Sequence, residues 1–200
     1  MKSSDSEICL PETVLSVDGY KYFFGKAVSN EDIKNALEID YMCYDDLYHL
    51  DWESCIAYHR KNPYIYIMAS DDSGKIVGYV NFSPVTEAIY ETMRSGKSVD
   101  TVITADDILE YSSGKEYSVY FSSICVHPDH RNKGISRMML KCLKDLIGNL
   151  EKSDIHIKRV VADAVSEPGE RLLSVLGFKM VCTSEHDSKI MERVFYDNRD

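Results

Sequence analysis

The feature that most constrains the fold is a buried strand that runs through a short basic turn into an amphipathic helix. Residues 117–126 are rich in aromatic, β-branched and small residues, as in a central strand, and Pro128 follows them. From residue 135 to residue 150 the apolar positions recur at helical spacing and form one stripe: Ile135, Met138, Met139, Cys142, Leu143, Leu146, Ile147 and Leu150. A strand and a helix joined so closely predict an α/β domain in which the helix packs on a sheet.

The remaining periodicity predicts one mixed sheet of about six to seven strands, flanked by about four helices and an inserted helical segment. The predicted strands are residues 20–27, 64–69, 75–82, 117–126, 155–165, 178–183 and 190–196. The predicted helices are residues 30–44 with Asn30 as N-cap, 52–60, 85–94, a helix capped by Thr104, 135–150 and 168–176. We expect residues 18–200 to form a single domain with an insertion at about 85–116, preceded by a flexible segment at 1–17.

Charge and composition exclude several classes of protein. Acids outnumber bases 33 to 23, so the net charge of −10 argues against binding to nucleic acid or to anionic lipid. A cationic substrate is compatible with this balance. The N-terminus lacks the apolar segment of a signal peptide, and no apolar run approaches the ~20 residues of a membrane span. The six cysteines form no CxxC pair, which indicates reduced thiols rather than disulfides or a metal site. Together with the absence of a signal peptide and a membrane span, this predicts a cytoplasmic location.

The turn between the strand and the helix has the chemistry of an anion site. A helix start leaves backbone N–H groups without intrahelical partners, and the helix dipole favours negative charge there. Gly134 and Ser136 are small enough to let an anion approach the backbone, and Arg131, Lys133 and Arg137 add positive charge. The predicted ligand is a phosphate or pyrophosphate. The motifs GxxxxGK[ST] and GxGxxG are both absent, and a solvated basic turn is the alternative.

Three segments resemble motifs of the GNAT superfamily, the GCN5-related N-acetyltransferases. Residues 131–136 (RNKGIS) resemble its (Q/R)xxGx(G/A) pyrophosphate turn, and residues 123–128 (SICVHP) resemble the strand end before that turn. Residues 172–178 (LLSVLGF) resemble the late "LYekLGF" segment. The resemblance extends through the order of elements from about residue 20 to residue 196, and it implies a sheet that is splayed in the middle.

The resemblance implies an acetyl-CoA site at the splayed strands. The backbone N–H groups of residues 132–137 would bind the pyrophosphate, the pantetheine arm would run beside the strand end, and the N–H near Ile124 would polarise the thioester carbonyl. The implied acetyl-CoA-binding residues are Ile124, Cys125, Val126, Arg131, Asn132, Lys133, Gly134, Ile135, Ser136 and Arg137.

Catalytic side chains are less clearly indicated. The family's base often lies at alternating positions of the strand before the turn, which here are Tyr120 and Ser122, neither a carboxylate nor a histidine. The tyrosine of "LYekLGF", a frequent general acid in the family, is replaced by Leu173, so Ser174, another tyrosine or water would supply the proton. Tyr120 could equally be a core aromatic. A covalent acyl-Cys125 is conceivable, but a small apolar strand residue is the simpler interpretation.

An acceptor site is implied at the first two helices. Residues 40–49 (DYMCYDDLYH) contain three tyrosines and three aspartates, and Tyr41, Tyr44 and Asp45 are the candidates for a rim that binds a cation. Packing on one helical face explains the tyrosines equally well. The insertion at 85–116 is longer than an ordinary connection, so it could act as a lid, a specificity element or a dimer surface.

Together these features predict an N-acetyltransferase. Direct attack in a ternary complex would transfer the acetyl group from acetyl-CoA to a primary amine of a small molecule or peptide. A non-catalytic CoA-binding regulatory module is the first alternative, favoured by Leu173 and by the absence of a strand carboxylate. A structural protein whose turn binds nothing is the second. We expect no nucleic-acid or membrane partner, and a homodimer is possible.

Overall fold

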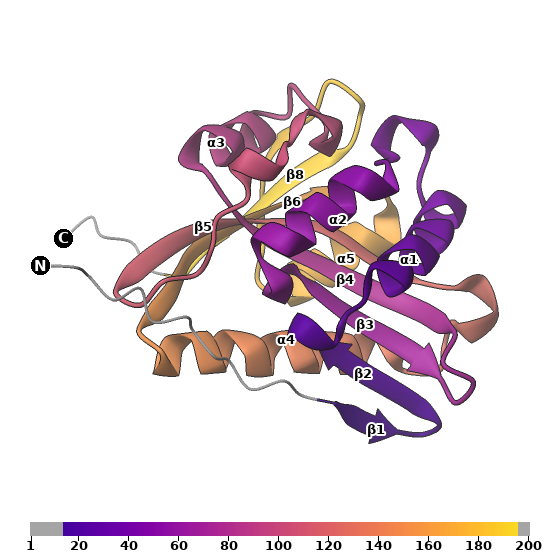
Figure 1. Cartoon of the computed structure of the whole chain (residues 1–200). Helices are drawn as coiled ribbons and strands as arrows, with labels where there is room; N and C mark the ends of the chain where they lie inside the picture. Colours follow the sequence, from indigo (N-terminus) through magenta and orange to yellow (C-terminus); the bar gives the residue numbers. More distant parts are fainter. Residues whose placement is uncertain (1–13, 196–200) are drawn as a thin grey trace, which may run out of the picture.

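The computed structural model describes residues 14–195, which form an α/β domain around one sheet of eight strands (Figure 1). The strands are β1 (Leu15–Val17), β2 (Tyr20–Phe24), β3 (Tyr66–Asp71), β4 (Ile76–Val85), β5 (Lys115–Val126), β6 (Ile155–Ala164), β7 (Lys179–Thr183) and β8 (Lys189–Val194). The helices are α1 (Asn30–Cys43), α2 (Trp52–Lys61), α3 (Glu87–Ser95), α4 (Ile135–Lys152) and α5 (Glu167–Val175). The predicted mixed α/β class is therefore confirmed.

The order of strands across the sheet is β1-β2-β3-β4-β5-β6-β8-β7. Neighbouring strands are antiparallel except β5 and β6, which are parallel and are connected through α4. This parallel pair lies in the interior of the sheet, with antiparallel strands on both sides. The described part of the sheet therefore has a single parallel pair of strands in its interior, joined by a helical crossover.

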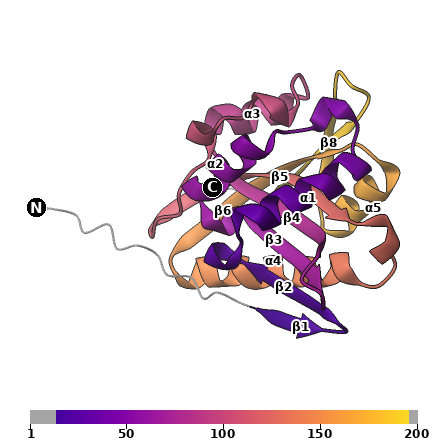
Figure 2. The same ribbon diagram turned by 45° about the vertical axis from the view of Figure 1, so that its right-hand side comes forward.

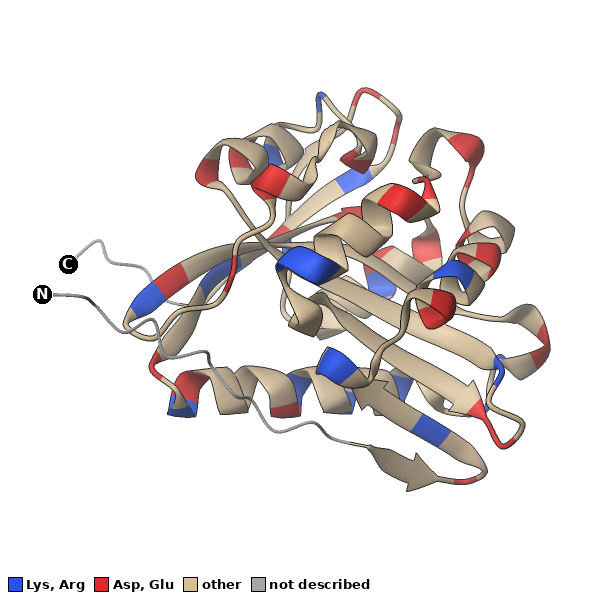
Figure 3. Cartoon of the chain, in the orientation of Figure 1, with Lys and Arg blue, Asp and Glu red and all other residues tan. Residues whose placement is uncertain are grey.

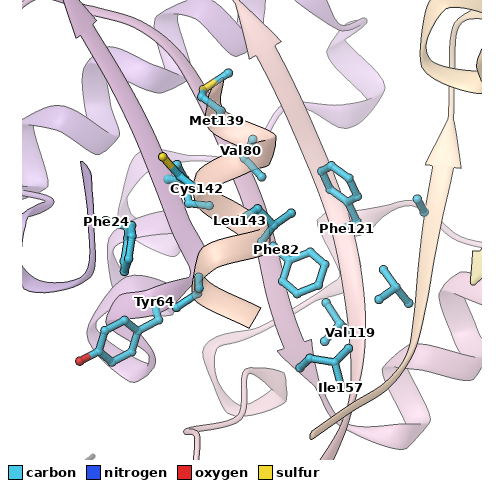
Figure 4. Packing of buried hydrophobic residues seen from close by; sticks show 14 of the residues in the cluster. Phe24, Tyr64, Val80, Phe82, Val119, Phe121, Met139, Cys142, Leu143 and Ile157 are labelled. Atoms are coloured by element: carbon cyan, nitrogen blue, oxygen red, sulfur yellow. The ribbon is translucent and has the colours of Figure 1, made fainter. Parts of the chain in front are cut away.

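Helices cover both faces of the sheet (Figures 1 and 2). The apolar stripe of α4 packs on one face, where Met139 and Leu143 lie against Val80 of β4 and Phe121 of β5 (Figure 4). On the other face, α1, α2 and α3 contribute to a second cluster that includes Ile33, Ile56 and Tyr90. The sheet therefore separates two cores, and each core holds β5 in place from one side.

The N-cap of the first helix lies one residue earlier than predicted. Ser29, not Asn30, is the N-cap: its side chain accepts a hydrogen bond from the Asp32 N–H, and the Asp32 carboxylate accepts one from the Ser29 N–H. This reciprocal pair satisfies two N–H groups that the helix itself leaves free, whereas Asn30 lies inside the first turn.

The insertion at 85–116 differs from the prediction. Val85 ends β4 instead of starting a helix, and the helix expected at Thr104 is only the 3-10 turn η5 (Ala105–Asp107). Thr104 and Asp107 do form a capping box. The helix stops there because Ile108 bridges Val85 and the Leu109 N–H donates to the Pro84 carbonyl, which draws the chain into an extended conformation. A further 3-10 turn, η4 (Asp100–Val102), lies between α3 and η5.

The N-terminal edge also differs from the prediction. Leu15–Val17 forms β1 and pairs with β2, within the segment expected to be flexible. Three residues are too few to carry a strand periodicity, so the prediction of six to seven strands missed this one. The rest of the predicted flexible segment, residues 1–13, lies outside the described residues. Between residues 14 and 195, no helix combines the length and the apolar character needed to cross a membrane.

We predict that Gly78 of β4 is required for close packing of β5 and α4. A Cβ atom at this position would lie 2.8 Å from the Cys125 carbonyl oxygen and 3.3 Å from the Met139 methyl group. Gly78→Ala should therefore lower the free energy of unfolding in urea by about 1–3 kcal/mol. The control is Gly148→Ala in α4, where a Cβ meets nothing within 4 Å and should add about 0.5–1 kcal/mol of stability. Equal stability of Gly78→Ala and the wild type would contradict this packing.

Candidate active site

The site begins where β5 and β6 separate. Their pairing runs from Lys115–Ile155 to Phe121–Ala162 and ends there, although β5 continues to Val126. Beyond this point β5 pairs only with β4, and β6 pairs only with β8. Between the pairs Asn81–Ser123 and Ser83–Tyr120, β4 advances by two residues and β5 by three, so β5 carries a bulge at this point.

The separated strands form one wall each of a cleft of about 820 Å³. Residues 121–126 of β5 line one side, and residues 162–166 at the end of β6 line the other. The start of α4 and the start of α5 close the two ends, with Leu172 and Leu173 among the lining residues. A cleft of this size and apolar character suits a sizeable organic ligand.

The turn before α4 opens directly into this cleft. Asn132 and Gly134 have positive φ angles of 62° and 77°, a region that glycine adopts readily. Gly134 is the N-cap of α4, and no side chain there accepts a hydrogen bond from the helix N–H groups. These donors therefore remain open to an anion. Arg131, Asn132, Gly134, Ile135 and Ser136 line the cleft, whereas Lys133 and Arg137 are exposed and lie outside its lining.

Tyr44 stands at the inner end of the cleft. The Ile124 N–H donates a hydrogen bond of 3.4 Å to the Tyr44 hydroxyl, so this amide of β5 points away from β4 and toward the cleft. Burial raises the pKa of Tyr44 well above its usual value, and the nearby Cys125 thiol adds to this effect. Tyr44 therefore keeps its proton at neutral pH and can donate it.

Two cysteines lie beside Tyr44. A hydrogen bond from Cys125, together with the Arg131 guanidinium 3.5 Å from the Cys43 Sγ, lowers the pKa of Cys43 to about 6. The pKa of Cys125 is raised, first by its hydrogen bond with Cys43 and then by burial. The thiolate of this pair is therefore favoured on Cys43, while Cys125 on β5 stays protonated and is a poor nucleophile.

A group of buried carboxylates lies behind β5, on the α1 side of the sheet. Asp100 of η4 is only 6% exposed, and its Oδ2 accepts a hydrogen bond of 2.9 Å from the Ser122 hydroxyl. Its Oδ1 has no hydrogen-bond partner. Asp40 of α1 accepts a hydrogen bond from the Tyr79 hydroxyl, and Asp163 of β6 also has an unpartnered Oδ1.

Each of these carboxyl groups has a raised pKa. Burial is the first cause for Asp100, and the charges of Asp40 and Asp163 add to it, which brings the pKa to about 7. Burial is also the first cause for Asp40 and for Asp163. Among residues 14–195, no Lys, Arg or His forms an ion pair with Asp100, so desolvation is not offset by an opposite charge.

Two small cavities, each of about 20 Å³, lie between the carboxylates and β5. Both are lined by Tyr48, Asp100, Ser122 and Ser123. One extends beneath α1 to Asp40, and the other extends toward Asp163. Ser122 and Ser123 also line the large cleft, so these two residues border all three spaces.

The structure brings together some of the predicted site residues and separates others. Ser122 borders all three cavities, and the buried Tyr120 lines one of the small ones. Ser174 is exposed on α5, outside the lining of the cavities. Of the acceptor candidates, Tyr44 lies inside the cleft, whereas Tyr41 donates to the Leu50 carbonyl and Asp45 is exposed.

The sequence analysis missed the carboxylates of the site. Asp40, Asp100 and Asp163 come from α1, η4 and β6, so no spacing in the sequence relates them. One signal was available: Asp163 interrupts a strand that is otherwise apolar toward its end. In residues 14–195, no cluster of three or more His, Cys, Asp or Glu side chains has the arrangement of a metal site.

Acidic side chains also dominate the surface near this part of the molecule. Figure 3 shows Asp and Glu on α1, α3 and the neighbouring loops above the sheet, with Lys and Arg more thinly spread there. The field on this side of the molecule therefore favours the approach of a cation.

Comparisons with known proteins give a consistent result. Residues 30–178 match the model of the acetyltransferase (GNAT) family. The fold is similar to that of Ard1 from Thermoplasma volcanium, with a TM-score of 0.57, 12% identity, and coverage of 90% of this chain and 99% of that one. It is also similar to the loading GNATL domain of CurA from Lyngbya majuscula, with a TM-score of 0.63, 13% identity, and coverage of 86% and 96%.

A third similar structure contains a bound ligand. This is the PaiA N-acetyltransferase from Thermoplasma acidophilum in complex with coenzyme A, with a TM-score of 0.53, 12% identity, and coverage of 88% of this chain and 99% of that one. At these identities the structures support the fold alone. A search of curated protein sequences finds no significant match.

We predict that Asp100 makes stability depend on pH. Its folded-state pKa of about 7 lies above the ordinary value of 3.8, so between these pH values the folded state binds more protons than the unfolded state. Stability is therefore lost as pH rises from about 4 to 7. Urea unfolding should show Asp100→Asn gaining stability relative to the wild type between pH 5 and 8, by up to about 4 kcal/mol. A stability difference that does not change with pH would contradict the raised pKa.

Proposed function

The chain belongs to the GNAT family of N-acetyltransferases, which use acetyl-CoA, and on that premise we propose that its acceptor is a primary amine. The amine, of a small molecule or peptide, attacks the thioester directly in a ternary complex. The observation that carries this proposal is the separation of β5 from β6. It leaves one cleft that joins the uncapped start of α4 to the inward-facing N–H of Ile124 and to the acid-lined cavities behind it.

The cleft fits acetyl-CoA in shape and in donors. The open N–H groups at the start of α4 suit the pyrophosphate, and Arg131 adds positive charge beside them. The edge of β5 that β6 leaves free suits the amide-containing pantetheine arm. The Ile124 N–H, now bound only to Tyr44, suits the thioester carbonyl oxygen, where it would stabilise the negative charge that develops during attack.

Tyr44 is the side chain best suited to protonate the departing thiolate. The position where the family often has a tyrosine is Leu173, which is buried and carries no proton donor. Tyr44 is the C-cap of α1 and lines the same cleft as Leu173, with its hydroxyl beside Ile124 and Cys125. Because its pKa is raised, the hydroxyl carries its proton at neutral pH, and a tyrosinate formed there would quickly be reprotonated.

Direct attack is favoured over an acyl-Cys125 intermediate. The Cys125 thiol is 3% exposed, and its pKa is raised by Cys43 and by burial, so it is not ionised at neutral pH. Direct attack requires only that the amine and thioester be held together, which a cleft with two connected compartments provides. A CoA-binding module without turnover remains the alternative, because Leu173 removes the usual tyrosine, and the kinetic experiment below separates the two.

We predict that Gly134→Val weakens acetyl-CoA binding at least tenfold, measured by isothermal titration calorimetry. A Cβ at this position meets no protein atom within 4 Å, so the new side chain would fill the space above the α4 amides without a clash in the fold. The positive φ of 77° adds strain, of about 1–3 kcal/mol. Gly74→Val is the matched control, since Gly74 has a φ of 86° and equally open surroundings in the β3–β4 hairpin. Equal loss of affinity in both variants, or in neither, would contradict the placement of the ligand.

We predict that Tyr44→Phe lowers kcat by roughly 100-fold while leaving the affinity for acetyl-CoA unchanged. Tyr41→Phe is the control, because its hydroxyl donates to the Leu50 carbonyl outside the cleft and its loss should leave kcat unaltered.

The same thiol-release assay tests the proposed reaction. For the wild type, initial rates at varied concentrations of both substrates should give intersecting double-reciprocal lines. Parallel lines would indicate an acyl-enzyme, and bound acetyl-CoA with no transfer to any amine would support the non-catalytic module.

A further inference from the structure

The acid-lined cavities behind β5 have a composition that packing does not explain. Asp100 is buried in the inserted segment, retains an unpartnered Oδ1 and lines both cavities. Asp163, whose Oδ1 is also unpartnered, lines the second cavity together with Asp100. A buried carboxylate oxygen that accepts no hydrogen bond is unfavourable, so each of these two oxygens is available to a hydrogen-bond donor such as a cation.

Resting on the proposed function, we propose that these cavities bind the ammonium group of an unbranched primary alkylamine between Asp100 and Asp163, and that Asp100 is the base that deprotonates it. The unbranched carbon chain belongs either to a small aliphatic amine or to a lysine side chain. The insertion at 85–116 therefore supplies the catalytic base, which β5 lacks.

The size of the cavities selects the class of amine. Each measures about 20 Å³, which is room for about one water-sized group. An ammonium group on a CH2 chain fits such a space, whereas an amine on a branched carbon brings a second substituent to the narrowest point. The rings of Tyr44, Tyr48 and Tyr120 line the cavity toward Asp163 and offer faces to the cation and its methylene groups.

The position of Asp100 suits proton removal next to the thioester. Its Oδ2 is held by Ser122, which borders the small cavities and the large cleft, and its Oδ1 is free to accept a proton. The raised pKa of about 7 makes it a stronger base than an ordinary carboxylate, with about half of the groups ionised at pH 7. The titratable groups that interact with it are Asp40 of α1, Tyr48 of the 3-10 turn η2 (Asp46–Tyr48), Cys55 and Tyr58 of α2, Tyr120 of β5 and Asp163 of β6.

The proposed step balances in protons and electrons. The ammonium gives one proton to Asp100, and the neutral nitrogen attacks the thioester carbon. The C–N bond forms, the C–S bond breaks, and the sulfur leaves with its electron pair. Tyr44 protonates the thiolate, and the second proton of the former ammonium restores the Tyr44 hydroxyl. Asp100 then releases its proton to solvent, so the products are the N-acetyl amine, CoA thiol and one proton.

The substrate experiment compares amines that differ only in branching, with acetyl-CoA and the full chain. We expect n-butylamine to exceed sec-butylamine in kcat/KM by on the order of 10- to 100-fold. A peptide with one lysine and a blocked N-terminus, compared with n-butylamine, distinguishes a lysine side chain from a small amine. Preference for sec-butylamine, or for a lysine-free peptide with a free N-terminus, would overturn the inference and leave the proposed function standing. Absence of transfer to every amine despite acetyl-CoA binding would overturn both.

The variant experiment tests the base. Asp100→Asn should lower kcat/KM by about 10²- to 10⁴-fold at pH 7. Its residual rate should rise about tenfold per pH unit up to pH 9, following the fraction of free amine. The affinity for acetyl-CoA should be unchanged, and this result would show that the variant is folded. Asp106→Asn, an exposed residue of the same insertion, is the control and should behave as the wild type.

Asp163→Asn gives a second readout that does not require removing the base. The Asp163 charge contributes to the raised pKa of Asp100, so its removal should move the acidic limb of the kcat/KM profile to lower pH. Wild-type activity of Asp100→Asn, or an acidic limb unchanged by Asp163→Asn, would overturn the assignment of Asp100.

Discussion

The site depends on the point at which two parallel strands stop pairing. Beyond Phe121 and Ala162, β5 and β6 no longer share hydrogen bonds, and a bulge in β5 changes its direction at that point. The two cores fix the strands on either side, because α4 packs on one face of β5 and α1, α2 and α3 cover the other. The strand edge exposed by the separation is therefore held open by packing and offers its backbone groups to a ligand.

The buried carboxylates suggest why the protein tolerates such an arrangement. Asp40 and Asp163 lie close enough to Asp100 for their charges to raise its pKa, and no described Lys, Arg or His forms an ion pair with Asp100. Such a cluster works against folding, and the substrate that neutralises it recovers part of that cost on binding. The same carboxylates therefore lower the stability of the free protein and bind the acceptor, a trade-off that is common at functional sites.

Local features of the site were predictable from the sequence, and long-range ones were not. The strand, turn and helix around Gly134 are contiguous, so their periodicity and turn chemistry specify them directly. Tyr44 was predicted to face the acceptor, and the fold turns it into the cleft beside Ile124. Asp100 lies in a 3-10 turn without periodicity, and it is buried among residues from separate parts of the chain, from Asp40 of α1 to Ser122 of β5 and Asp163 of β6. The capping box at Thr104 predicted a helix, but strand-like hydrogen bonds to β4 ended it after one turn.

The central claim is that one continuous cavity brings a CoA thioester at the separated strands to an amine held by Asp100. A crystal structure with a bisubstrate analogue, in which CoA is joined through an acetyl bridge to an unbranched alkylamine, tests it most directly. We expect the pyrophosphate on the N–H groups of residues 132–137, the bridge carbonyl at the Ile124 N–H, and the amine nitrogen within hydrogen-bond distance of Asp100. An alkyl chain that leaves the cleft elsewhere, with Asp100 untouched, would contradict the claim.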